Sequence, residues 1–120
     1  MATAPHIGED PEAWLTLLWD SFSSRLFGAV LELWVAARTD DELRNTLLPY
    51  ERGLRRTLRQ LSRARTPHNW PDETFGRAFD MTLTYYRGLA LTSVLTDAAH
   101  IEQIKQEWAK AVSHLLRTAE

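Results

Sequence analysis

The fold class follows from two consecutive stretches, DETFGRAFDMTLTYYRGLALTSVL at residues 72–95 and DAAHIEQIKQEWAKAVSHLLRT at residues 97–118. In the second stretch, apolar residues recur every three or four positions, which is the period of an α-helix. In the first stretch, Arg87 is the only charged residue from Met81 to Leu95, and apolar residues populate several faces. Acidic residues at its start suit the positive end of a helix dipole. Both stretches are therefore predicted to be helices.

The first half of the chain has the same helical period. Asp10-Pro11-Glu12 is typical of a helix start, because an Asp can cap free backbone N–H groups and Pro is tolerated in the first turn. This helix is expected to end near Phe22. Ser23-Ser24 marks a break, and residues 25–38 are predicted to form a second helix. Apolar residues cover most of its circumference, which indicates a central position.

Residues 39–71 contain the remaining helix signals. Thr39 and Glu42 fit a capping box that opens a third helix. Pro49 is expected to divide this region into a short helix at about 40–47 and a longer one ending near Arg63, the alternative being a kink in one helix. Residues 66–71 are expected to form a loop. The sequence therefore predicts an all-α bundle of about six helices.

Composition indicates one globular domain spanning residues 1–120, with residues 1–8 disordered. The 120 residues are 44% apolar and 25% charged, and the net charge of −2 provides no general attraction to nucleic acid or anionic membranes. Cysteine is absent. The most apolar stretch, residues 27–37, is far shorter than the roughly 20 residues that span a bilayer. We expect a cytoplasmic protein that makes no membrane contact.

The last two predicted helices favour self-association. Residues 81–95 are apolar on opposite sides, so this helix is expected to pack both inward and against a partner. Gly88 costs about 1 kcal/mol in a helix interior and, with Thr92 one turn later, permits another helix to approach closely. We predict a homodimer joined by an intersubunit four-helix bundle, the alternative being an ordinary core face. The candidate interface residues are Leu89, Val94, Ile101, Ile104, Trp108, Val112 and Leu115.

Five tryptophans are many for a chain of this length. Aromatic residues at helical spacing belong to a core by default, but so many rings are hard to pack without gaps, and a ring-lined cleft suits a small hydrophobic or aromatic ligand. The candidate ligand-binding residues are Phe27, Leu31, Trp34, Tyr50, Phe79, Leu83 and Tyr86.

Charged residues within apolar helices need partners. Glu32, Asp80 and Arg87 are expected to form one internal ion-pair network, with recognition of a polar ligand as the alternative. The arginine run within residues 52–65 is interpreted as a solvated face balanced by the acids at 40–42, and phosphate binding is the second interpretation.

Catalysis and metal binding have no positive support in the sequence. His100 and His114 lie fourteen residues apart, so about 21 Å of helix separates them, and neither has a chelating partner one turn away. No nucleophile elbow, phosphate loop or paired general acid and base is present. We predict no enzyme, no metal and no cofactor.

Several segments resemble the C-terminal half of TetR/AcrR-type bacterial transcriptional regulators. They are LELWVAARTDDELR at 31–44 and LPYER at 48–52, together with the stretch from RAFD at 77–80 to RGLAL at 87–91, which is similar to the penultimate helix of that family. The resemblance implies an all-helical regulatory domain that dimerises through its last two helices and holds an effector among the earlier ones.

The same resemblance implies how such a domain acts. An effector changes the separation of DNA-binding domains across the dimer, and thereby the affinity for an operator. Regulators of this type read DNA with an N-terminal helix-turn-helix domain, and no segment of this chain matches one. We therefore expect a ligand-sensing and dimerisation domain that reaches DNA only through such a domain. The alternative is a helical protein-interaction module that binds no effector.

Overall fold

Helices make up almost all of the part of the chain that the structure, a computed structural model, describes, which is residues 12–66 and 70–118. The prediction of an all-helical fold is confirmed for these residues, among which no strand occurs. The elements are α1 (Glu12–Phe22), α2 (Arg25–Ala37), α3 (Asp41–Arg63), α4 (Asp72–Thr92), a short 3₁₀ turn η1 (Ser93–Leu95) and α5 (Ala98–Thr118).

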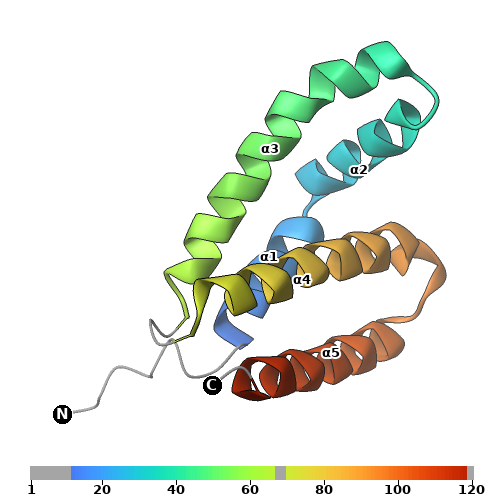
Figure 1. Ribbon diagram of the computed structural model, residues 1–120. Coiled ribbons are helices and arrows are strands. Elements are labelled where there is room, and N and C mark those ends of the chain that lie inside the picture. The colour runs from blue at the N-terminus through green and yellow to red at the C-terminus, as the bar shows by residue number, and fades with distance from the viewer. Residues whose placement is uncertain (1–11, 67–69, 119–120) are drawn as a thin grey trace.

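Helix α4 is the central element of the arrangement. It packs against α1, α2, α3 and α5, while α1 also contacts α3 and α2. Figure 1 shows α2 and α3 as one helical hairpin and α4 and α5 as another, with α1 beside α4 where the two hairpins approach each other. Helix α5 thus lies at one edge of the bundle, and the α4 side chains of Met81 and Tyr85 are exposed among the described residues.

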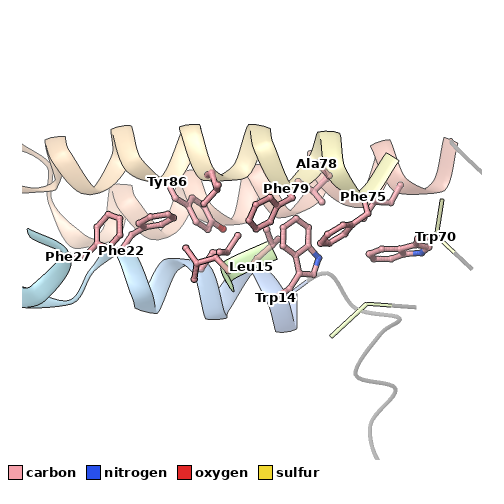
Figure 2. Close-up of a cluster of buried hydrophobic side chains, with 14 of the residues drawn as sticks. Trp14, Leu15, Phe22, Phe27, Trp70, Phe75, Ala78, Phe79 and Tyr86 are labelled. Atoms are coloured by element: carbon pink, nitrogen blue, oxygen red, sulfur yellow. The ribbon is translucent and has the colours of Figure 1, made fainter. Parts of the chain in front are cut away.

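Aromatic side chains fill the core rather than line a void. Figure 2 shows a row of them between α1 and α4, from Trp70 at one end to Phe27 at the other. The Trp14 and Phe75 ring centroids are 5.4 Å apart, and the Phe22 ring meets the Phe27 ring edge-on at 4.4 Å. Trp14 and Phe79 are fully buried. Edge-to-face pairs of this kind add to the stability that buried area alone provides.

The predicted count of about six helices is not confirmed among the described residues, because α3 continues through Pro49. A proline inside a helix removes one N–H donor and crowds the carbonyl four residues earlier, here that of Asn45. Both Pro49 and Asn45 are exposed, so water can solvate the carbonyl that loses its donor. Packing of α3 against α1 and α2 holds the two halves in line.

Most predicted helix limits agree with the structure, and two do not. Ser24 caps α2 by accepting a hydrogen bond from the Phe27 N–H, and Asp97 caps α5 through the His100 N–H. Helix α3, however, is capped by Asp40, whose Oδ1 accepts from the Leu43 N–H at 3.0 Å, and not by Thr39. Helix α4 gives way to η1 three residues before Leu95. The predictions for residues 1–8 and for Asp10-Pro11 lie outside the described residues.

Candidate functional site

An apolar surface covers the uncovered side of α4 and the adjoining side of α5. Five of the eleven large hydrophobic side chains that are exposed lie between residues 81 and 95, namely Met81, Tyr85, Leu91, Val94 and Leu95. Met81, Tyr85, Gly88 and Thr92 recur at helical spacing and so share one side of α4. We call this side, with Trp108 of α5, the α4–α5 face.

Trp108 joins the two helices within one chain. Its ring stacks on Tyr85, with centroids 4.6 Å apart and planes 13° from parallel. Its indole Nε1 donates a hydrogen bond to Thr82 Oγ1 at 3.0 Å. A shallow hollow of about 470 Å³ lies beside the stacked pair, lined by Asp80, Met81 and Thr84 as well as the two rings. The face is therefore a broad, largely apolar surface with a fixed aromatic centre.

Gly88 lies on the α4–α5 face with open space above it. A Cβ atom built on Gly88 meets nothing within 4 Å, and the residue is exposed. Nothing among the described residues therefore requires a glycine at this position, although glycine in a helix interior costs about 1 kcal/mol relative to alanine. Gly76 on the same helix differs, because its Cβ would lie 2.9 Å from the guanidinium of Arg59.

The seven residues predicted for the interface take three different positions. Leu89 and Val112 are buried in the core of this chain, because their helical positions turn them inward between α4 and α5. Ile101, Ile104, Trp108 and Leu115 are half-buried along α5, and Val94 is 85% exposed in η1. Sequence spacing missed Met81 and Tyr85, which together with Trp108 make up the apolar part of the α4–α5 face.

The seven residues predicted to bind a ligand do not surround a single cavity. Four of them are buried core residues, namely Phe27, Leu31, Phe79 and Leu83. Tyr86 is also buried but borders a hollow, and Trp34 is half-buried at the side of a groove. Tyr50 is 74% exposed and lines neither opening. The structure therefore separates the predicted set into core and surface positions.

A groove of about 220 Å³ lies between the end of α2 and the first half of α3. Apolar side chains make most of its wall, and Arg38, Arg44 and Glu51 supply its charges. Its lining residues are Trp34, Ala37, Arg38, Arg44, Leu47, Leu48 and Glu51. Of these only Trp34 was a predicted ligand-binding residue, although the pair Leu47-Leu48 before a proline is a sequence signal that marks this place.

The expected ion-pair network has different members. Glu32 is exposed on α2, whereas the Arg87 guanidinium binds Glu51 of α3 and Asp80 binds Arg55 of α3. The Arg87 guanidinium also lies over the Trp34 ring, 4.3 Å from its centroid. Ion pairs therefore connect α4 to α3, and the Arg87 guanidinium also reaches α2 through the Trp34 ring.

Two arginines of the run on α3, Arg55 and Arg63, pair with acids of α4. Besides the pair made by Arg55, Arg63 contacts Asp72 at 3.0 Å, donates to the Trp70 carbonyl at 2.6 Å and lies over the Phe75 ring. The acids at 40–42, which were expected to balance the run, include Asp41, and this residue pairs with Arg44 instead. Both of these α3 arginines thus serve packing between α3 and α4.

Tyr86 borders a second hollow of about 220 Å³ between α1, α4 and α5. Glu12, Glu102 and Lys105 also line it, and Lys105 binds Glu102 at 2.9 Å. Burial raises the pKa of the Tyr86 phenol above its usual range, and Tyr85 and the two carboxylates raise it further. This hollow is therefore polar, with its ammonium group already paired, and it favours the neutral phenol.

No family model, curated protein or solved structure matches the chain. Among the described residues, no group of three or more His, Asp or Glu side chains is placed to hold a metal ion. None of the helices in residues 12–66 and 70–118 has the length and apolar character needed to cross a membrane. Among the described residues, the α4–α5 face and the α2–α3 groove are two largely apolar surface features outside the packed core.

Proposed function

We propose that this chain is a regulatory domain of the TetR/AcrR type, which forms a homodimer and senses a small ligand. The observation that carries the proposal is the α4–α5 face, where Met81 and Tyr85 are exposed beside the stacked Trp108. In the dimer, the α4–α5 faces of two chains pack together as an intersubunit four-helix bundle. Monomeric proteins rarely expose an extended apolar surface, and a symmetric dimer covers the same patch on both subunits.

The physical chemistry of the face supports a helix as its partner. Gly88 leaves the α4 backbone open to a close neighbour, with Thr92 one turn away on the same side. Burying apolar area contributes about 25 cal/mol per Å², so the apolar area that this face would remove from water provides the main driving force for association. Aromatic residues and Met are enriched at such interfaces, which agrees with Tyr85, Trp108 and Met81.

Ligand sensing is supported by the resemblance of residues 31–44 and 48–52 to this class of regulator and by the α2–α3 groove, most of whose lining residues lie in these stretches. In the proposed mechanism, a ligand binds one of two arrangements of the dimer more tightly and shifts the population towards it. DNA is then read by a helix-turn-helix domain outside this chain.

A second candidate is a helical interaction module that dimerises and senses nothing. The observation that favours it is the packed core, in which four of the residues predicted to bind a ligand are buried against one another. The two candidates share the homodimer and differ only in ligand binding, so binding measurements separate them.

The dimer is tested by sedimentation equilibrium over a dilution series. We expect a dimer at tens of micromolar, and Met81→Glu should shift the chain towards monomer because it places a charge inside the interface. Met81 is 50% exposed in the single chain, so the variant should still fold. Trp108→Glu is a poorer choice, since Trp108 also contacts Tyr85 and Thr82 of its own chain.

The matched control is Leu33→Glu, which changes a similarly exposed leucine on α2. This variant should sediment as the unaltered chain does. If the unaltered chain is monomeric at tens of micromolar, the proposed dimer is contradicted. It is also contradicted if Met81→Glu and Leu33→Glu shift the chain towards monomer to the same extent.

A further inference from the structure

The groove between α2 and α3 has the composition of a site for an amphipathic anion. Its wall is made largely by Trp34, Ala37, Leu47 and Leu48, and Leu48 is 41% exposed there. A volume of about 220 Å³ is below the roughly 300–1,000 Å³ of sites for drug-sized ligands. The groove therefore fits a short alkyl chain or a single substituted ring.

The charges around the groove leave a positive surplus. Glu51, its one acid, already binds the Arg87 guanidinium. Arg38 makes no ion pair with any residue of 12–66 or 70–118, and Arg44 pairs only with Asp41, whose side chain is 84% exposed. Exposed pairs of that kind contribute little and exchange partners readily. Two guanidinium groups are thus available to a carboxylate at the groove.

Binding in the groove would reach α4 through two side chains. Trp34 and Glu51 both line the groove, and both contact Arg87 of α4. Arg87 directly precedes Gly88 of the α4–α5 face. An occupant that moves the Trp34 ring or the Glu51 carboxylate therefore acts on the helix that we place at the dimer interface.

We propose that the α2–α3 groove binds a small amphipathic carboxylate, such as a medium-chain fatty acid or an arylalkanoic acid. The apolar part lies against Trp34, Leu47 and Leu48, and the carboxylate accepts hydrogen bonds from Arg38 and Arg44. This inference rests on the proposed function, since it identifies the ligand class and the place of sensing in that domain. Guanidinium groups suit this role because their planar donors match the two oxygens of a carboxylate.

The proposal is tested by isothermal titration calorimetry of the full chain with octanoate, octanol and octylamine. Octanoate should bind once per chain with a Kd below about 1 mM, which is tight enough to measure directly. Octanol, which lacks the charge, should bind about tenfold more weakly, because a charge-assisted hydrogen bond is worth at least that factor. Octylamine should bind weakest, since its ammonium group meets the guanidinium groups.

Two variants locate the site, each with a matched control. Arg38→Gln should weaken octanoate about tenfold and leave octanol unchanged, whereas Arg25→Gln, an exposed change at the other end of α2, should leave both unchanged. Leu48→Glu should weaken octanoate at least tenfold by placing a negative charge in the groove. Its control is Leu61→Glu, a similarly exposed position of α3 outside the groove.

Several outcomes would overturn the proposal: no saturable octanoate binding, equal binding of octanol or octylamine, or unchanged affinity in both Arg38→Gln and Leu48→Glu. Circular dichroism checks that the variants are helical, and Arg38→Gln decides alone if Leu48→Glu unfolds. Sedimentation of the same samples separates this proposal from the dimer. A monomer that binds octanoate contradicts only the dimer, and a dimer that does not bind octanoate contradicts only the ligand site.

Discussion

Tyr86 is a buried phenol in a hollow that two carboxylates also line. Burial raises its pKa above the value of about 10 for an unfolded chain, and Tyr85, Glu12 and Glu102 act in the same direction. A raised pKa in the folded state means that folding favours the protonated phenol. The resulting stabilisation is complete below pH about 10 and is lost as pH rises through the folded-state pKa.

The unfolding free energy should therefore fall above pH about 10, and Tyr86→Phe should fall less steeply because it has no phenol to ionise. Urea denaturation of both chains at a series of alkaline pH values measures this difference. Every other titrating group is common to the two chains, so it cancels in the comparison. Parallel curves would show that Tyr86 ionises equally well in the folded and unfolded states.

Trp108 shows what spacing can say about a single residue. The helical spacing of apolar residues in α5 placed Trp108 on an apolar side of that helix, and in the structure Trp108 is half-buried. Trp108 stacks on Tyr85 and donates a hydrogen bond to Thr82, and these residues lie about 25 positions away in the sequence. No short-range sequence pattern predicts such contacts. A tryptophan has both a large apolar ring and an N–H donor, so tertiary neighbours decide which of its surfaces is covered.

Helix α3 is the element in which local reasoning failed most clearly. Proline in a helix interior costs about 3 kcal/mol, which made a break at Pro49 the reasonable prediction. The helix spans 23 residues, and its packing against α1 and α2 outweighs one lost hydrogen bond. The caps of α2 and α5 were predictable because a cap depends on side chains only a few residues away.

Pro49→Ala should stabilise the chain by about 1–3 kcal/mol, since it restores an N–H donor to the Asn45 carbonyl and removes the crowding by the ring. Urea denaturation at neutral pH measures the gain. Pro71→Ala serves as the control, because Pro71 caps the start of α4, where no helical hydrogen bond needs its N–H. That change should stay within about 0.5 kcal/mol of the unaltered chain. A loss of stability in Pro49→Ala would mean that the proline shapes α3 in a way that packing requires.

At the scale of the whole molecule, charged side chains connect α3 to α4. The Arg87 and Glu51 side chains are only about a quarter exposed, and Arg87 lies against Trp34 as well. Arg77 and Glu73 form an ion pair within α4 whose side chains are mostly exposed. The first pair is expected to contribute to stability far more than the second, because screening by water is weaker where side chains are partly buried.

Glu51→Gln should lower the unfolding free energy by about 1–3 kcal/mol, because it leaves the guanidinium of Arg87 without its charged partner. Glu73→Gln should change it by less than about 0.5 kcal/mol. Thermal and urea unfolding of the two variants give the comparison. Equal effects would indicate that the pair between α3 and α4 is as well solvated as the surface pair.

The sequence by itself determined the helical class and most helix limits, because periodicity and caps act over a few residues and leave a local trace. It also indicated that residues 81–95 are apolar on opposite sides. Only the tertiary structure decided which aromatic rings fill the core, which acids pair with the arginines of α3, and where the groove lies. Those features depend on which sides of the helices pack together, and this is determined by the packing of the whole chain. The α4–α5 face and the α2–α3 groove could be identified only after the structure had shown which residues are buried in the core.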